Sequence, residues 1–227
     1  MKILSIETAG NICAAALTED DKLIKEIIID DGNTHSVKLM PLIDKLLSET
    51  NTKISDIDLF ACDIGPGSFT GIRIGVSTIK AFIDVTEKNA VGITSLEILA
   101  NNIDTQEIVC SVIDAKNENV YYGFFKKENN IYKQIGDLGF DNINNVIEFA
   151  KQKNKKIIFI GNGSTIYKDM IESKMNNAEI ILDEEKNKLN ARNIAFTAFL
   201  KQDTVVDSNN LRPVYLRKSN AEMQLKK

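Results

Sequence analysis

The chain has 227 residues, of which 43% are hydrophobic and 26% are charged, and its formal net charge is −4 at pH 7. These values are typical of a globular protein with a buried core, built as one large domain or as two of about 100 residues each. The acidic balance excludes the overall basic surface of a stand-alone nucleic-acid-binding domain. Any contact with RNA therefore requires a local patch or a partner.

The cysteine pattern and the hydropathy pattern indicate the compartment. Cys13, Cys62 and Cys110 lie far apart in apolar, strand-like runs, so we expect buried, reduced thiols and a reducing compartment. Polar residues follow the first apolar run too early for a signal peptide, and no apolar stretch reaches the ~18 residues of a membrane span. We expect a cytoplasmic protein without a membrane partner.

The first half of the chain alternates between strand and helix patterns. The pattern predicts, in order, strands over 2–8, 12–17 and 23–29, a helix over about 35–47, a strand over 59–64, a glycine-rich loop over 65–71, a helix over 72–86, a strand over 90–93 and a helix from Ser95. Asn33 and Thr34 offer N-cap oxygens for the first helix.

The second half repeats this order of elements. We predict strands over 108–114, 120–125 and 131–135, a helix over about 143–151, a strand over 157–160, a Gly-Asn-Gly loop, a helix from Thr165 and a last helix over about 191–200. The duplication favours an α/β fold of the actin, Hsp70 and sugar-kinase type, with two βββαβα domains facing a cleft. We place the domains at 1–103 and 104–227, the second with the last helix and the tail.

The loop 65–71 ends a buried strand and opens a helix. Glycines there leave backbone N–H groups at a helix N-terminus, where an anion is favoured. The candidate phosphate-contacting residues of this loop and the following turn are Gly65, Gly67, Ser68, Thr70, Gly71 and Arg73. The alternative is a tight turn with ordinary capping, and the loop matches neither the P-loop nor the dinucleotide-binding pattern.

Similar positions occur at the strand ends of both halves. Glu7 and Thr8 end the first strand, and Asp114 ends its counterpart in the second half. Gly161 and Gly163 lie where the backbone passes close to a nucleotide in this type of fold. Each position is also typical of an ordinary turn, and only the equivalent placement in both halves favours a nucleotide-facing role.

Two helices in the first half have apolar residues on more than one face. In the helix 72–86, Ile72 and Val76 share one face, and Ile74, Ala81 and Val85 share roughly the opposite one. The second apolar face contacts either neighbouring helices or another subunit. The candidate partner-contacting residues on these two helices are His35, Val37, Leu39, Met40, Leu42, Ile74, Ser77, Thr78, Ala81 and Val85.

The chain contains a single histidine, His35. A zinc protease of the H-E-x-x-H kind needs two histidines on one helix, and no G-x-S-x-G elbow is present for a serine hydrolase. The sequence therefore argues against a peptidase and predicts neither catalytic residues nor a metal site. We expect His35 to serve the start of its helix, or to contact a partner.

Several motifs together resemble the TsaB (YeaZ) family over nearly the whole chain. They are the opening Met1–Ala9, His35-Ser36 with Met40-Pro41, the block Gly65-Pro66-Gly67-Ser68-Phe69-Thr70-Gly71, Ile113-Asp114-Ala115-Lys116, Gly161-Asn162-Gly163 and Pro213-Val214-Tyr215-Leu216-Arg217. The glycine-rich block is the most specific of them. Glu7 departs from the family pattern, which more often has Asp at this position.

The resemblance implies an actin-like protein that helps to make threonylcarbamoyladenosine next to the anticodon of tRNAs that read codons starting with A. It implies pairing with a TsaD-type transferase, whose metal site this chain lacks, and with a TsaE-type ATPase. ATP, metal and tRNA would then be handled by the complex, and the chain would self-dimerise through its N-terminal half when alone. The competing hypothesis is an actin-fold ATPase or phosphotransferase that uses Glu7, Asp114 and the glycine loops by itself.

Overall fold

The computed structural model describes residues 1–30 and 35–217 and divides the chain into two compact units. The first unit combines Met1–Ile98 with Leu189–Val214, and the second combines Leu99–Lys188 with the segment from Tyr215. The expected N-cap residues Asn33 and Thr34 lie outside the described residues. Among the described residues, no helix is long and apolar enough to cross a membrane.

The unit boundary differs from the sequence-based one in two ways. It falls between Ile98 and Leu99 instead of after residue 103, and the last helix belongs to the first unit instead of the second. The helix packs there because the Ser5 hydroxyl donates a hydrogen bond of 2.6 Å to the Ala191 carbonyl, and Ile194 and Ala198 pack against the first sheet. The chain thus returns to the unit in which it began.

The first unit is built on a mixed sheet of five strands in the order β3-β2-β1-β4-β5. The strands are β1 (Lys2–Glu7), β2 (Cys13–Glu19), β3 (Lys22–Ile29), β4 (Leu59–Asp63) and β5 (Asn89–Ile93). β1 pairs antiparallel with β2 and parallel with β4. Glu7 and Asp63 are therefore the last residues of two adjacent parallel strands.

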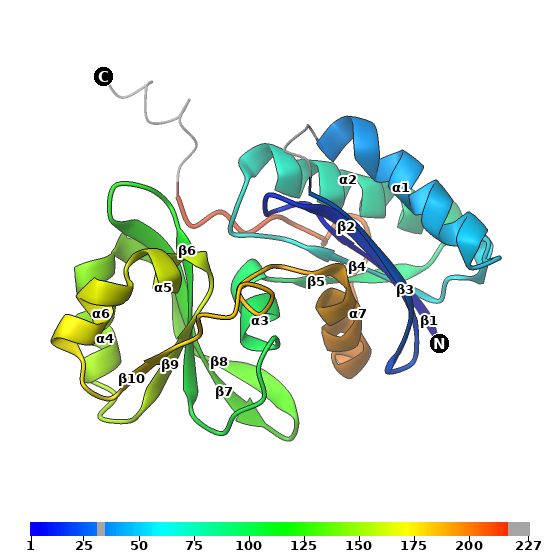
Figure 1. The fold of residues 1–227 in the computed structure, drawn as a ribbon. Coiled ribbons are helices and arrows are strands. Elements are labelled where there is room, and N and C mark those ends of the chain that lie inside the picture. Colours follow the sequence, from blue (N-terminus) through cyan, green and yellow to red (C-terminus); the bar gives the residue numbers. More distant parts are fainter. Residues whose placement is uncertain (31–34, 218–227) are drawn as a thin grey trace. The chain divides into compact units, whose positions relative to one another are not determined.

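Helices cover both faces of this sheet (Figure 1). α1 (His35–Glu49) and α2 (Phe69–Thr86) pack on one face with Leu4 and Ile6. Ile98 of α3 (Ser95–Ala100) and the helix α7 (Ala191–Leu200) pack on the other face with Ile3 and Ala61. The 3₁₀ turns η1 (Ile54–Asp56) and η2 (Gln202–Thr204) complete the unit. Because alternate strand residues point to opposite faces, both faces of the central strands are apolar.

The second unit repeats the first, with the sheet order β10-β9-β6-β7-β8. Its elements are β6 (Ile108–Asp114), β7 (Asn119–Glu128), β8 (Ile131–Asn142), α4 (Ile143–Lys151), β9 (Ile157–Ile160), α5 (Asn162–Ile166), α6 (Lys168–Lys174) and β10 (Ala178–Ile180). β6 pairs antiparallel with β7 and parallel with β9, as β1 pairs with β2 and β4. The predicted duplication of βββαβα is confirmed in the strand order.

Three elements of the second unit differ from their sequence-based bounds. β8 extends to Asn142 instead of ending near 135, although Gly136 interrupts it with φ 75°. α5 begins at Asn162, so the Gly-Asn-Gly segment enters a helix instead of forming only a loop. β10 was not predicted, because three residues with little apolar content give no strand pattern. The three cysteines are buried and unpaired, as predicted.

Candidate functional site

The glycine-rich segment lies at the junction of β4 and α2. α2 begins at Phe69, three residues earlier than expected, and Ser68 is its N-cap. The Ser68 hydroxyl accepts a hydrogen bond of 3.2 Å from the Gly71 backbone N–H. The oxygen that was predicted to reach a ligand or cap the helix therefore caps the helix.

The glycines of this segment are required by contacts within the unit. A Cβ at Gly67 would lie 2.5 Å from the Ala9 carbonyl oxygen, and a Cβ at Gly71 would collide with the Thr8 carbonyl oxygen. The Ser68 N–H donates to the Ala9 carbonyl, and the Thr8 hydroxyl donates to the Gly71 carbonyl, both at 2.8 Å. Backbone of residues 8–9 thus packs directly against the loop at Gly67 and Gly71.

Two further residues at the start of this segment have special geometry. The peptide bond between Gly65 and Pro66 is cis, and Gly65 has φ 97°, which favours glycine.

The polar candidates Thr70 and Arg73 are exposed, and the Arg73 guanidinium lies 4.5 Å from the centre of the Phe69 ring. Three candidates of this loop, Ser68, Thr70 and Arg73, therefore have exposed side chains.

Glu7 points into the unit instead of into solvent. Its side chain is completely buried, and Oε1 accepts hydrogen bonds of 2.8 Å from the N–H groups of Ala9 and Gly10. Burial, followed by the nearby Asp63, raises the pKa of the Glu7 carboxyl well above its usual value. Through its Oε1 atom, the Glu7 carboxyl group thus organises the turn after β1.

Asp63 is the functional candidate that sequence reasoning missed. Its Oδ1 accepts hydrogen bonds from the Gly65 N–H at 2.6 Å and from the Ser95 hydroxyl at 2.7 Å. Burial raises the pKa of Asp63 to about 6. The available signal was an acidic residue at the end of an otherwise apolar strand, at the same place in its strand as Glu7.

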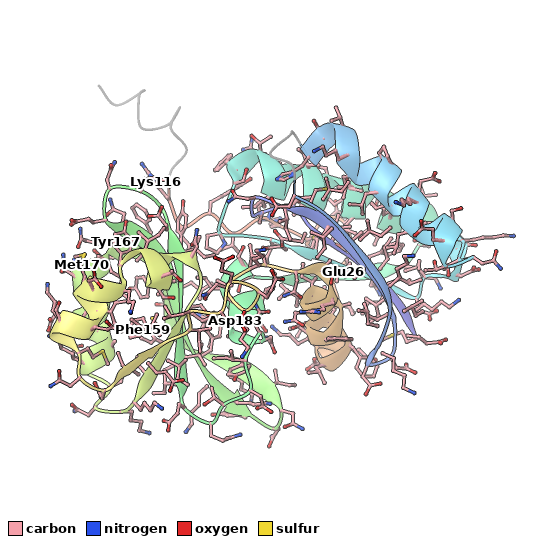
Figure 2. All side chains as sticks on the ribbon, in the orientation of Figure 1. Glu26, Lys116, Phe159, Tyr167, Met170 and Asp183 are labelled. Carbon is pink, nitrogen blue, oxygen red and sulfur yellow. The ribbon has the colours of Figure 1, made fainter. Side chains whose placement is uncertain are left out.

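In the second unit, Asp114 interacts with the side chains of Lys116 and Tyr167. Figure 2 labels these two partners. The Tyr167 hydroxyl donates to Oδ1 at 3.0 Å, and the Lys116 ammonium lies 3.0 Å from Oδ2. Burial alone would raise the pKa of Asp114, but the hydrogen bonds from these partners outweigh it and lower the pKa. Both carboxylate oxygens are therefore engaged at the end of β6.

The glycines of the second unit mirror those of the first. A Cβ at Gly161 would collide with the Val112 carbonyl oxygen, and one at Gly163 would lie 2.7 Å from a Val112 methyl carbon. Gly161 also has φ 105°, and its N–H donates to the Asn187 side-chain oxygen at 2.6 Å. In both units, then, the glycines allow a strand-to-helix junction to lie against the neighbouring central strand.

The candidate partner-contacting residues divide into buried and exposed groups. Leu39 and Leu42 are buried in the core, so their assignment to a partner surface is corrected. Val37, Met40 and Val85 are 67%, 51% and 82% exposed, respectively. Ser77 and Ala81 are exposed, whereas His35, Ile74 and Thr78 are half-buried. We call these exposed apolar side chains, Val37 and Met40 in the first two turns of α1 and Ala81 and Val85 in the last two turns of α2, the α1/α2 apolar surface.

His35 has a local structural role at the start of α1. Its ring Nε2 lies 3.1 Å from the Gly10 carbonyl oxygen and can donate to it, and its Cδ2 would lie 3.2 Å from a Cβ at Gly71. Within residues 1–30 and 35–217, no group of three or more His, Cys, Asp or Glu side chains is arranged to hold a metal ion. The arrangement links β1, α1 and α2 through short polar contacts.

The duplicated βββαβα topology defines an actin-like α/β protein. A putative N-acetylmannosamine kinase from Listeria monocytogenes shares the fold, with a TM-score of 0.53 and 11% identity over 90% of this chain and 100% of that chain. YeaZ from Pseudomonas aeruginosa is more similar, with a TM-score of 0.77 and 20% identity over 95% of this chain and 99% of that chain. These two likenesses show the fold alone.

Sequence comparison places the chain in a family. The family model described as tRNA N6-adenosine threonylcarbamoyltransferase, TsaD, matches residues 24–225. The tRNA threonylcarbamoyladenosine biosynthesis protein TsaB of Bacillus subtilis is 29% identical over 98% of this chain and 96% of its own length. The chain belongs to the TsaD-type tRNA N6-adenosine threonylcarbamoyltransferase family, within which it is of the TsaB (YeaZ) type.

Proposed function

We propose that the chain is a non-catalytic partner in the threonylcarbamoylation of the adenosine next to the anticodon in tRNAs that read codons starting with A. The observation that carries the proposal is the end-to-end similarity to a curated TsaB, which covers 98% of this chain. Its partner is a TsaD-type transferase that performs the transfer. The chain contributes binding surface and activation of that partner instead of reacting groups.

The geometry of the glycine loops supports a role without nucleotide chemistry. Residues 8–9 fill the space beside Gly67 and Gly71, and Val112 does the same beside Gly161. Glu7 is buried, and Asp114 already interacts with Lys116 and Tyr167. An ATPase would need these groups free to contact phosphate and metal, so the features favour the partner role over an independent ATPase or phosphotransferase.

The α1/α2 apolar surface supports the placement of the partner. Exposed aliphatic side chains on neighbouring helices are costly in water, at ~25 cal/mol per Å² of apolar surface. Val85 alone is 82% exposed, and Val37 and Met40 are more than half exposed. We propose that the TsaD-type protein covers this surface in a heterodimer, and that a second copy of the chain covers it when the partner is absent.

The chain works as part of a larger complex. A TsaE-type ATPase joins it, and ATP and metal act through these partners. The tRNA binds to the complex, in keeping with the net charge of −4 on this chain. The complex works in the cytoplasm.

Reconstitution tests the proposed function. TsaD- and TsaE-type partners, threonylcarbamoyl-adenylate synthase, ATP, threonine, bicarbonate and tRNA are combined with and without this chain, and modified adenosine is measured by mass spectrometry. We expect modification only when the chain is present, and no modification by the chain without the TsaD-type partner. Equal modification without the chain would refute the proposal, and ATP hydrolysis by the isolated chain would favour the enzyme hypothesis.

A further inference from the structure

Glu7 and Asp63 end neighbouring strands at matched positions. The parallel register pairs Ile6 of β1 with Cys62 of β4, so the next residues along the two strands are Glu7 and Asp63. Adjacent strands lie about 4.8 Å apart, and matched residues on parallel strands point to the same face of the sheet. Both side chains are buried, with 0% and 1% exposure. Two acidic groups thus lie side by side without access to water.

The hydrogen bonds of the two carboxyl groups satisfy one oxygen of each residue and leave the other oxygen buried without a partner. Glu7 Oε1 is held by two backbone N–H groups, and Asp63 Oδ1 by the Gly65 N–H and the Ser95 hydroxyl. Among the described residues, Glu7 Oε2 and Asp63 Oδ2 have no hydrogen-bond partner. The two carboxyl groups leave adjacent strand ends on the same face of the sheet, so a hydrogen bond between them is the interaction available to the two unpartnered oxygens. Ionised carboxylates only accept, so this bond requires a proton on one of them.

We propose that Glu7 and Asp63 share a single proton in the folded chain. The hydrogen bond formed by this proton holds the end of β1 next to the end of β4, and, through Asp63, next to the start of α3. Loss of the proton would leave two negative charges in a buried site, where their repulsion is not screened by water. This inference concerns the isolated chain and does not depend on the proposed partner.

The shared proton is linked to the start of α1 through the backbone. Glu7 Oε1 holds the Gly10 N–H, and the Gly10 carbonyl oxygen lies 3.1 Å from His35 Nε2. Asp63 holds the N–H of Gly65, at the entry to the loop that packs on residues 8–9. Separation of the two carboxylates would therefore displace the turn after β1, and the contact of His35 with that turn would change.

The groups around the pair favour retention of the proton. Burial is the largest cause that raises the pKa of both carboxyls, and Asp63 adds to the effect on Glu7. Cys13 on β2 and Cys62 on β4 interact electrostatically with Glu7, and burial raises the pKa of both thiols, which keeps them neutral. α3 faces the pair with the neutral Ser95 hydroxyl, and α7 packs on β1 with the Ala191 carbonyl.

The positive and titratable groups of α1 lie on the other face of the sheet. Lys38 interacts electrostatically with Cys13, and His35 contacts Gly10 through its ring. Neither Lys38 nor His35 is among the causes that shift the pKa of Glu7 or Asp63. The balance at the pair therefore depends on burial and on the two carboxyls themselves.

The sign of the pH effect follows from the raised pKa. The unfolded chain releases this proton above about pH 4.5, whereas the folded chain retains it. The stabilisation of the folded chain by the shared proton is therefore complete below about pH 4.5. It is lost as the pH rises towards the raised pKa of the pair. Over that range, one extra bound proton makes the unfolding constant rise about tenfold per pH unit.

The test compares amide variants of the full chain. Glu7→Gln carries a permanent donor towards Asp63, and its amide oxygen can still accept from Ala9 and Gly10. Urea unfolding is measured between about pH 5.5 and 8, with Glu19→Gln, a change at an exposed glutamate, as the control. We expect the ratio of the wild-type unfolding constant to that of Glu7→Gln to rise about tenfold per pH unit over this range. The control should give the same ratio as the wild type.

Asp63→Asn provides the reciprocal test, since its amide donates to Glu7, and it should flatten the pH dependence in the same way. The ring signals of His35, the only histidine in the chain, should shift in the wild type as the carboxyl pair loses its proton, and this shift should be absent from both amide variants. Parallel slopes for the wild type and Glu7→Gln, or failure of both amide variants to fold, would overturn the proposal.

Discussion

The replacement of Gly71 by alanine separates two explanations of the glycine-rich loop. In the packing explanation, the glycine is needed because a Cβ would collide with the carbonyl oxygen of Thr8. Backbone cannot escape by changing a rotamer, so we take the upper end of the usual cost of overpacking, about 3 kcal/mol. Alanine inside a helix is more favourable than glycine by about 1 kcal/mol of helix stability, which offsets part of this cost. The net expectation for Gly71→Ala is a loss of about 2 kcal/mol in the free energy of unfolding.

The assay for Gly71→Ala is unfolding of the ligand-free chain, followed by far-ultraviolet circular dichroism because the chain contains no tryptophan. A loss of about 2 kcal/mol corresponds to a fall of about 4–8 °C in Tm for a chain of this size. The control is Ser77→Ala on the exposed face of the same helix, which should change the stability by less than about 0.5 kcal/mol. If Gly71→Ala were as stable as the wild type and lost only anion binding, the packing explanation would be refuted.

Three further predictions concern stability and thiol reactivity. Ser68→Ala removes the N-cap of α2 and should cost about 1 kcal/mol in urea unfolding, and an unchanged midpoint would count against the cap. Lys201→Met leaves the buried Glu97 carboxylate without the ammonium group that binds both its oxygens, so we expect a loss of about 2 kcal/mol at pH 8. That loss should shrink near pH 5, because Glu97 can then bind a proton, and equal losses at both pH values would contradict the assignment. Burial raises the pKa of Cys13 to about 11 and raises the pKa of Cys62 and Cys110 as well, so a thiol reagent at pH 8 should label the folded chain far more slowly than the urea-unfolded chain.

The overall architecture was accessible from the sequence because both halves follow the same strong patterns. The β1 segment alternates and is rich in Ile and Leu, the β4 segment is a short apolar run, and α2 has apolar residues at helical spacing, so their type and order could be predicted. The return of α7 to the first unit could not be predicted. Chain order gives no indication of it, and the contacts that fix α7, such as the bond from Ser5 to Ala191, join residues 186 positions apart.

The candidate site was predicted less well than the fold, for a physical reason. The sequence identifies glycines at strand-to-helix junctions, but not what occupies the space beside them. At Gly67 this is the Ala9 carbonyl, and at Gly161 it is the Val112 carbonyl. Asp63 was overlooked because an acid at a strand end is typical of a solvated turn, and only the register with β1 reveals its neighbour, Glu7.

The helix patterns overestimated the partner-contacting surface. Leu39 and Leu42 satisfied the same apolar pattern as Val37 and Met40, yet they face the core. The periodicity of α1 shows that more than one face is apolar, but it does not show how wide the buried face is. The structure reduces the apolar candidates to the exposed side chains of α1 and α2.

The central claim is that the chain acts by binding a TsaD-type partner through the α1/α2 apolar surface. The most direct measurement is light scattering of the mixed proteins, together with tRNA modification, for Val85→Glu and for Leu200→Glu. Leu200 is a matched control, since it is a 43% exposed aliphatic residue of α7 on the opposite face of the same sheet. We predict that Val85→Glu loses both the heterodimer and the modification, whereas Leu200→Glu retains both. A full-strength heterodimer with Val85→Glu would contradict this account of how the chain works.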